Sequence, residues 1–332
     1  MESVALRPSV DLLVSNVDGG GGLTNVIPAV PELLILSGLP ASGKTTRAKA
    51  WVLENPEWRT RINYDDLRLE LYGPDWVFNR ADEDAMKKVA EETVKTCLNA
   101  GLSVVVDNTN LTPRVRDKWA GIGRSLGAKV VEQEVDTNVD QCVAQDRLRT
   151  GRARVGQAVI DRMALWTGWI DWQEPTIYSR DFVIVDMDGT IADCGERRKA
   201  LEPRPDPDKP GMLKKDWNAF FRGVDGDTPI WPIIRLATML SETHDILVVS
   251  GRPIDRAGIA TEDWLRKFST FKWKHLFMRN GGDFRPDYEV KQEILEYLPK
   301  HRIAYVLDDR NQVVEMWRRN GLTTLQVADG AF

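Results

Sequence analysis

The stretch LLILSGLPASGKTT, at residues 33–46, constrains the fold of this chain most strongly. Its apolar run predicts a buried strand over residues 33–37, and residues 44–54 carry the pattern of a helix. The turn between them fits the phosphate-binding pattern G-x-x-x-x-G-K-[ST] through Gly38, Gly43, Lys44 and Thr45. In such a turn the backbone N–H groups and the helix N-terminus face the phosphates of a nucleoside triphosphate. We expect Lys44 to contact the outer phosphates and the Thr45 hydroxyl to bind Mg²⁺.

Short apolar runs alternate with amphipathic stretches along the rest of the chain, which is typical of parallel α/β sheets. In the first half we expect strands over residues 58–62, 103–110 and 129–135, and helices over 82–100 and 113–126. In the second half we expect strands over 182–186, 246–250 and 303–307, and helices over 261–268 and 312–320. A segment rich in Trp and Pro, residues 164–181, interrupts the alternation, and we interpret its tryptophans as packing between two units. The sequence therefore predicts a flexible extension over residues 1–30 and two domains over 31–180 and 181–332.

Composition sets further limits on function. No apolar run has membrane-spanning length, so we expect no membrane partner. Three widely spaced cysteines indicate no disulfide framework, and three histidines show no zinc-ligand spacing, so a metal held by oxygen, such as Mg²⁺, is expected. The net charge of −5 argues weakly against a nucleic-acid partner, but residues 146–163 concentrate five arginines. These arginines form either a local positive surface or a solvated helix face.

The first unit also carries candidates for binding the phosphate acceptor. In INYDDLR, at residues 62–68, Asp65 is placed to take a proton from an acceptor hydroxyl, and Arg68 to bind a substrate phosphate. The alternative for this pair is a helix N-cap with a solvated arginine. Asn108 and Thr109 end a predicted strand and face either substrate or a turn. Arg149 or a close neighbour in the arginine-rich segment is a candidate lid residue that stabilises the transferring phosphoryl group.

The second unit opens on DMDGT, which places Asp186 and Asp188 at one strand end. Two carboxylates there repel each other unless a cation lies between them, so the pair predicts bound Mg²⁺. We expect Asp186 to attack phosphorus and form an aspartyl phosphate, and Asp188 to protonate the leaving oxygen and then activate water. Gly189 lets the chain turn sharply, and Thr190 orients the nucleophile.

Other strand ends in this unit supply matching groups. Ser250 and Arg252 are placed to bind the phosphoryl group, Lys291 to neutralise its charge, and the pair Asp308 and Asp309 to complete the metal shell. An insertion over residues 194–230 follows the first strand and is expected to cap the site.

GLPASGKTT, NYDDLR, DNTNL, DMDGT and VVSGR follow one another in this order, and DDRNQVVEMWRRNGLTTLQVADGAF at residues 308–332 is the most distinctive stretch. In these motifs the chain resembles the bacteriophage polynucleotide kinase 3′-phosphatases, which heal nucleic-acid ends. The resemblance runs from about residue 33 to residue 332, and the second unit also resembles haloacid dehalogenase-type phosphatases as a class. It implies an α/β fold, with a P-loop kinase parallel sheet domain followed by a Rossmann-like haloacid dehalogenase-type phosphatase domain with a small cap insertion.

The resemblance also assigns residues by match. The residues that would serve ATP and Mg²⁺ are Gly38, Ser42, Gly43, Lys44, Thr45 and Thr46. Asp65 matches the base for the nucleic-acid 5′-OH, and Arg68 matches the residue that binds the adjacent phosphate. Asn108 and Thr109 fall where the family has substrate-contacting Asp-Thr, so Asn108 is a departure. Arg149 matches the kinase lid arginine only with one inserted residue, which leaves Arg147 and Arg152 as alternatives.

In the second unit, the matching residues are Asp186, Asp188, Arg197, Ser250, Arg252, Asp287, Lys291, Asp308 and Asp309. Among them Arg197, Arg252 and Asp287 are expected to bind substrate, and Asp186, Asp188 and Asp309 to hold the metal. Arg197 lies in the capping insertion, and FRPDYEVK carries both Asp287 and Lys291.

The resemblance implies a bifunctional enzyme that uses ATP to phosphorylate 5′-OH ends of RNA or DNA and removes a 3′-phosphate or 2′,3′-cyclic phosphate. It further implies a downstream nucleic-acid ligase, a homotetramer and a cytoplasmic location, in the host cell if the protein is phage-encoded. Because an ionised phosphate is bound by charge and metal, we expect little base specificity. One alternative is a small-molecule kinase fused to a metabolic phosphatase, and another is a binding protein with degenerate sites.

Overall fold

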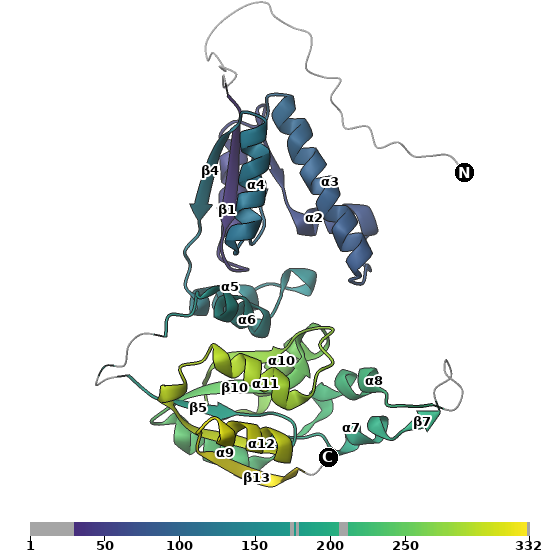
Figure 1. Ribbon diagram of the computed structural model, residues 1–332, viewed down its shortest axis with the longest axis vertical. Coiled ribbons are helices and arrows are strands. Elements are labelled where there is room, and N and C mark those ends of the chain that lie inside the picture. The colour runs from purple at the N-terminus through teal and green to yellow at the C-terminus, as the bar shows by residue number, and fades with distance from the viewer. Residues whose placement is uncertain (1–29, 173–175, 177–178, 206–211, 331–332) are drawn as a thin grey trace, which may run out of the picture.

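The computed structural model describes residues 30–172, 176, 179–205 and 212–330. Of the extension predicted over residues 1–30, only Val30 lies within the described residues. Two separate parallel sheets organise the chain, as the strand–helix alternation predicts (Figure 1).

The first sheet has four parallel strands in the order β2-β3-β1-β4. Its strands are β1 (Glu32–Ser37), β2 (Arg59–Ile62), β3 (Ser103–Asp107) and β4 (Lys129–Glu134). Its helices are α1 (Lys44–Leu53), α2 (Tyr64–Tyr72), α3 (Arg80–Asn99) and α4 (Pro113–Ser125). Successive strand side chains point to opposite faces. Accordingly Leu33 and Ile35 pack on α3 and α4, whereas Leu34 and Leu36 pack on α1.

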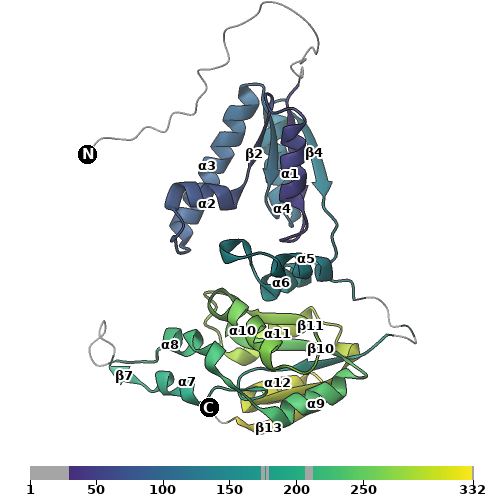
Figure 2. The ribbon, with the colours of Figure 1, turned by 180° about the vertical axis from the view of Figure 1, so that it is seen from behind.

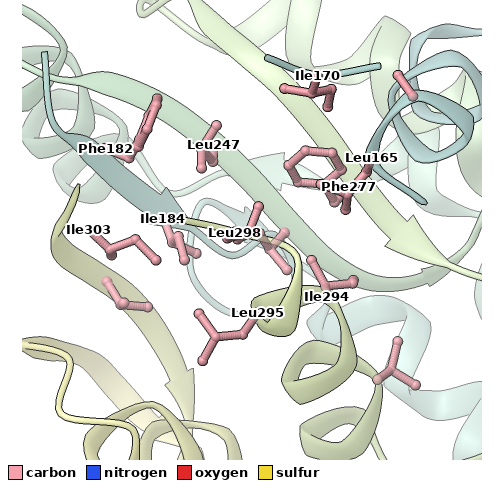
Figure 3. Close-up of a cluster of buried hydrophobic side chains, with 14 of the residues drawn as sticks. Leu165, Ile170, Phe182, Ile184, Leu247, Phe277, Ile294, Leu295, Leu298 and Ile303 are labelled. Atoms are coloured by element: carbon pink, nitrogen blue, oxygen red, sulfur yellow. The ribbon is translucent and has the colours of Figure 1, made fainter. Parts of the chain in front are cut away.

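The second sheet has five parallel strands in the order β11-β10-β5-β12-β13. Its strands are β5 (Phe182–Val185), β10 (Asp245–Pro253), β11 (Trp273–Arg279), β12 (Ile303–Arg310) and β13 (Thr324–Gly330). Its helices are α9 (Trp231–Ser241), α10 (Ile254–Phe268), α11 (Asp287–Glu296) and α12 (Asn311–Arg319). Ile184 and Leu247 pack against Ile294 and Leu295 of α11, as Figure 3 shows. The opposite face of the sheet packs on α9 and α10.

The insertion after β5 forms a small cap. Its elements are β6 (Ala192–Asp193), α7 (Gly195–Arg198), β7 (Arg204–Pro205), β8 (Leu213–Lys214), α8 (Trp217–Arg222) and β9 (Thr228–Pro229). Strand β6 pairs with β9, and β7 pairs with β8, both antiparallel. In Figures 1 and 2 this segment extends to one side of the second sheet.

Two helices, α5 (Val139–Arg147) and α6 (Gln157–Thr167), lie between the two sheets in both views (Figures 1 and 2). Residues of these helices, among them Cys142, Ile160 and Leu165, share a buried cluster with Phe182 and Phe277 of the second sheet. The tryptophans Trp166, Trp169 and Trp172 pack against the same cluster, which confirms the prediction that they serve packing.

Several element boundaries differ from those expected. Helix α10 begins at Ile254, seven residues before the predicted start, because Asp255 and Arg256 face solvent and hide the apolar period of its first turn. Strands β11 and β13 and helices α5 and α9 were not anticipated, and helices α2 and α6 entered the predictions only as alternatives. Within the described residues, none of the helices combines the length and the apolar character needed to cross a membrane.

Candidate active sites

The P-loop connects β1 to α1 and is shaped by a backbone conformation that suits glycine. Gly43 has φ 96° and ψ 5°, in the left-handed region, immediately before the first residue of α1. The ammonium of Lys44 donates to the Leu39 carbonyl at 2.6 Å and lies 3.3 Å from the Ser42 hydroxyl oxygen. Burial lowers the pKa of Lys44 to about 8. A cavity of about 580 Å³ beside the loop is lined by Ser42, Gly43 and Thr46, among others.

Asp107, the last residue of β3, reaches the same end of the sheet and was not identified from the sequence. Its buried carboxylate accepts a hydrogen bond from the Thr45 hydroxyl, and its Oδ2 lies 3.2 Å from Nη1 of Arg61. Burial raises the pKa of Asp107. Thr45 and Asp107 thus offer adjacent oxygen atoms of the kind that suits Mg²⁺ beside a nucleotide phosphate. The polar residue that ends the apolar run SVVVD is the signal that could have identified Asp107.

Asp65 and Arg68 lie together at the start of α2. The Asn63 side chain caps the helix by accepting from the backbone N–H groups of Asp65 and Asp66. Arg68 Nη1 lies 2.6 Å from Asp65 Oδ1, and the Asp65 side chain is 88% exposed. Arg68 also donates to both carboxylate oxygens of Glu83, at 2.8 Å each. That hydrogen bond raises the pKa of Arg68 and lowers the pKa of Glu83, another residue that the sequence did not single out.

Asn108 and Thr109 connect the start of α2, which carries the predicted catalytic base Asp65, to the P-loop. Asn108 Oδ1 accepts from the backbone N–H of Tyr64 at 2.9 Å, and the Thr109 carbonyl accepts from the N–H of Gly38 at 3.0 Å. The two residues therefore fix the distance between the predicted base and the phosphate-binding turn.

The three lid candidates differ in what they contact. Arg149 lies near enough to Lys44 for its charge to lower the Lys44 pKa, and its Nη1 lies 3.8 Å from Asp146 Oδ1. Arg147 instead donates to Gln157 and to Glu262 of α10, at 2.8 and 3.1 Å. Arg152 donates to the Trp76 carbonyl at 2.8 Å.

The second candidate site lies at the carboxyl ends of β5, β10 and β12. Lys291 donates from α11 to Asp186 Oδ1 at 2.6 Å and to Asp308 Oδ2 at 2.9 Å. The Thr190 hydroxyl donates to Asp186 Oδ2 at 3.2 Å. A Cβ on Gly189 would lie 2.1 Å from Asp309 Oδ2, so glycine is required for that carboxylate to approach the turn.

A metal ion fits this group of carboxylates. Among the described residues, Asp186, Asp308 and Asp309 are buried and offer oxygens that all lie within 4.8 Å of one another. Burial raises the pKa of Asp186 well above its usual range and that of Asp309 to about 6. Although burial opposes its charged form, the surrounding carboxylates raise the pKa of Lys291. One ammonium among three carboxylates leaves the charge unbalanced, and a hard divalent cation would balance it.

The Asp188 carboxylate lies outside this group and is held by two arginines. Its Oδ1 accepts from Arg252 Nε at 3.0 Å and Nη2 at 2.5 Å, and from Arg197 Nη2 at 2.7 Å. Burial alone would raise the pKa of Asp188, but the guanidinium groups of Arg252 and Arg197 lower it to about 2. Both arginines also bind Asp227, a buried residue of the insertion that the sequence did not identify.

Ser250 and Asp287 complete the polar lining. The Ser250 hydroxyl is buried and accepts from the Arg252 N–H at 3.3 Å. Asp287 lies 3.3, 3.6 and 3.7 Å from Arg279, Arg310 and Lys291, respectively. A Cβ on Gly251 would come within 2.0 Å of Asp287 Oδ1, so this glycine makes room for the carboxylate.

A pocket of about 360 Å³ opens onto these residues and is capped by the insertion, as expected. Asp186, Asp188 and Asp309 lie in its lining. The lining also includes arginines and aromatic rings: Trp217, Phe220, Phe221, Arg256, Arg279, Phe284, Arg285 and Arg310. Phosphate charge and a flat aromatic group are both complementary to such a wall.

The fold and the two sites define a protein that joins a P-loop kinase-type domain to a haloacid dehalogenase-type phosphatase domain. Residues 33–167 match the AAA domain family, and residues 180–332 match the family described as the polynucleotide kinase PNKP phosphatase domain. These two matches confirm the resemblance and the fold class predicted from the motifs.

The comparisons also found proteins that are similar to most of this chain. A putative bifunctional polynucleotide kinase/RNA ligase of Autographa californica nuclear polyhedrosis virus is 25% identical over 313 residues, which cover 88% of this chain and 42% of the viral protein. This chain thus spans less than half the length of that relative. Chains from two structures of a Pnkp1/Rnl/Hen1 complex are 26% and 25% identical, with TM-scores of 0.38 and 0.36. They cover 93% and 91% of this chain and 100% and 97% of their own length.

Proposed function

We propose that this protein heals broken nucleic-acid ends, by phosphorylating a 5′-OH with ATP and by removing a 3′-phosphate or 2′,3′-cyclic phosphate. The observation that carries the proposal is the phosphatase pocket, where aspartates, arginines and exposed aromatic rings lie together on a segment of the polynucleotide kinase phosphatase family. A phosphate monoester on a terminal nucleotide matches that combination, since the rings can stack on its base. The kinase-type domain in the same chain supplies the complementary reaction.

In the kinase site, Asp65 is proposed to accept the proton of the attacking 5′-OH. Its exposed carboxylate can reach a nucleic-acid end, and Arg68, 2.6 Å away, can bind the next phosphate. Lys44 would stabilise charge on the outer phosphates, and Arg149 would do so from the lid. Thr45, with Asp107 beside it, would hold Mg²⁺, which when bound neutralises phosphate charge.

In the phosphatase site, Asp186 is proposed to attack phosphorus while the bond to the 3′-oxygen breaks and Asp188 gives that oxygen a proton. Asp188 then takes a proton from water, whose oxygen attacks the aspartyl phosphate and releases inorganic phosphate. Lys291 and Ser250 would stabilise the transferring group. Bound Mg²⁺, held by Asp186 and Asp309 and neighbouring oxygens, would reduce repulsion between nucleophile and phosphate.

The low pKa of Asp188 sets a condition on this mechanism. An acid with a pKa of about 2 is ionised at neutral pH and gives no proton. The arginines that lower it are also the groups that would bind the substrate phosphate, so their contacts with Asp188 must weaken when phosphate enters. We therefore propose that substrate binding raises the pKa of Asp188 by drawing Arg252 and Arg197 toward the phosphate.

The proposal extends to partners and setting. The products, a 5′-phosphate and a 3′-OH, are what a nucleic-acid ligase joins, and the viral relative is named as a kinase/RNA ligase. We propose that ends of RNA, of DNA or of both are substrates, that the protein forms a homotetramer and that it acts in the cytoplasm, of the host cell if it is phage-encoded. Three cysteines that form no disulfide support a reducing compartment.

The test uses two oligonucleotides, one with 5′-OH and 3′-OH ends and one with 5′-phosphate and 3′-phosphate ends. Each is incubated with Mg²⁺, with and without ATP, and its intact mass is followed. We expect the first to gain one phosphate only with ATP and the second to lose one. Lys44→Ala should abolish the gain alone, and Asp186→Asn the loss alone. No change in either strand, together with turnover of small phosphate esters, would favour the small-molecule alternative instead.

A further inference from the structure

Helices α5 and α6 are the last two helices of the segment that matches the kinase-type family. Helix α6 nevertheless packs on the phosphatase domain. The matching segment runs to residue 167 and includes both helices. Helix α6 lies along β11, which is an edge strand of the second sheet. Its Leu165 shares a buried cluster with Leu247 and Phe277 of that sheet, as Figure 3 shows.

Polar side chains of α6 satisfy backbone groups on the open edge of β11. Asp161 Oδ2 accepts from the Leu276 N–H at 2.7 Å, Gln157 Nε2 donates to the Lys274 carbonyl at 3.1 Å, and Arg162 Nη1 donates to the Met278 carbonyl at 3.3 Å. All three α6 side chains are buried. An edge strand otherwise presents unpaired N–H and C=O groups, so these contacts fix the position of α6 on the phosphatase domain.

Residues 148–156 form the arginine-rich loop between α5 and α6. One buried carboxylate of the phosphatase domain binds both the residue before this loop and the residue after it. Glu262 of α10 accepts from Arg147 Nε at 3.1 Å, before the loop, and from the Gln157 N–H at 2.9 Å, after it. Its Oε2 also lies 3.4 Å from Nη2 of Arg154, within the loop. A buried carboxylate that pairs with two guanidinium groups and a backbone N–H holds all three in place.

A second carboxylate, on α5 of the kinase-type segment, also binds this loop. Asp146 of α5 accepts from the Val155 and Gly156 N–H groups at 3.1 and 2.8 Å. Arg149 lies between these anchors, 3.8 Å from Asp146, and its charge acts on Lys44 of the P-loop. The lid candidate whose charge acts on Lys44 is thus carried by a loop whose two ends are fixed by Glu262.

We propose that Glu262 is a positioning residue of the kinase reaction, so that the phosphatase domain holds the lid loop that presents Arg149 to the phosphates. This inference rests on the proposed kinase function. Glu262 pairs with Arg147, Arg154 and the Gln157 N–H, and it acts on the loop through these contacts. Misplacement of a group that stabilises transferring phosphoryl charge lowers kcat more than it weakens nucleotide binding.

The test compares full-length Glu262→Gln and Glu262→Ala with Glu315→Gln, which removes the same charge from a pair with Arg319 on α12. We expect kcat for 5′-OH phosphorylation to fall at least tenfold in both Glu262 variants, part of the ~10³ that such an arginine is worth. KM for ATP and the turnover of 3′-phosphate should stay within twofold. In an Arg147→Met background the Glu262→Gln change should lower kcat much less, because the contact of Glu262 with Arg147 is already absent.

Hydrogen exchange supplies a readout that needs no turnover. The amide of Gln157 should exchange faster in Glu262→Ala than in the wild type, and residues 148–156 should be cut faster by trypsin. Kinase kcat within twofold of the wild type in both Glu262 variants, while Arg149→Ala is strongly impaired, would overturn the proposal. If the wild type phosphorylates no nucleic-acid end, the proposed function fails, whereas unchanged exchange at Gln157 overturns the anchoring of the loop itself.

Discussion

The buried carboxylate of Asp227 binds the buried guanidinium of Arg252, with 2.6 Å between Oδ2 and Nη2. The same carboxylate accepts from Arg197 Nε at 2.5 Å. One residue at the end of the capping insertion therefore fixes both arginines that contact Asp188. The insertion thus supplies a buried side chain of the phosphatase site and also forms the cap over its pocket.

Loss of the Asp227 charge should impair the phosphatase alone. In Asp227→Asn an amide NH₂ group replaces one acceptor oxygen and the negative charge is lost, so the contacts that hold Arg197 and Arg252 in one geometry are weakened. We expect kcat for 3′-phosphate removal to fall about 10²-fold, which is the size of effect seen for small misplacements of catalytic groups. Steady-state assays of both activities check this, with the exposed neighbour change Asp225→Asn as the control. A loss of less than twofold would mean that the arginines are fixed by other contacts.

Much of the phosphatase site was evident in the sequence because its groups lie at the ends of apolar strands. Asp186, Ser250 and Asp308 follow runs of β-type residues, and parallel strands bring their carboxyl ends to one edge. Asp227 carries no such signal, since it follows a short 3₁₀ turn at Val224–Gly226 and is brought to the arginines only by the folding of the insertion. Strand β11 also escaped prediction, because WKHLFMR begins with Trp273, Lys274 and His275, whose polar groups contact α6 and β10.

In the kinase-type domain the P-loop motif could be recognised from the sequence, but the residues that hold the neighbouring arginines in place could not. The P-loop pattern identifies Lys44 and Thr45 from spacing alone. Glu83 and Glu262, by contrast, lie within long helices, and nothing in sequence spacing brings them to Arg68 or Arg147. Long-range ion pairs of this kind are visible only in three dimensions.

The aromatic wall of the phosphatase pocket predicts a preference for ends that carry a base. Phe284 lines the pocket and is 83% exposed, so its ring is open to a stacking partner. Stacking of a base on such a ring is worth ~1–3 kcal/mol. We expect Phe284→Ala to raise KM for a 3′-phosphate oligonucleotide about tenfold, and Phe284→Tyr to keep the wild-type value. An oligonucleotide with an abasic 3′-phosphate end should show no difference between the variants, and equal losses on both substrates would contradict stacking.

Arg149, rather than Arg147 or Arg152, is expected to stabilise the transferring phosphoryl group. It is the lid candidate whose charge acts on Lys44, whereas Arg152 contacts the Trp76 carbonyl. Removal of such an arginine typically costs ~10³-fold in kcat. Arg149→Ala should therefore lower kinase kcat by about this factor, with Arg152→Ala as the matched control that loses less than tenfold. The reverse ranking in single-turnover assays would assign the role to Arg152.

The pKa of Lys44 predicts how nucleotide affinity depends on pH. Burial lowers this pKa to about 8 in the free protein, and phosphate oxygens beside the ammonium should raise it in the complex. Below pH 8 the lysine is charged in both states, so ATP affinity is constant. Above pH 8 the free protein must first take up a proton to bind, so the dissociation constant should rise up to tenfold per pH unit until the pKa of the complex is reached.

Titration calorimetry between pH 7 and pH 10 without Mg²⁺ measures this slope, and proton uptake should appear as a dependence of the enthalpy on buffer. Lys44→Arg is the control, because its guanidinium stays charged over the whole range while every other titrating group is retained. We expect weaker binding by this variant, with a flat profile above pH 8. A wild-type profile that is flat to pH 10, or an equal slope in the two proteins, would show that another group carries the pH dependence.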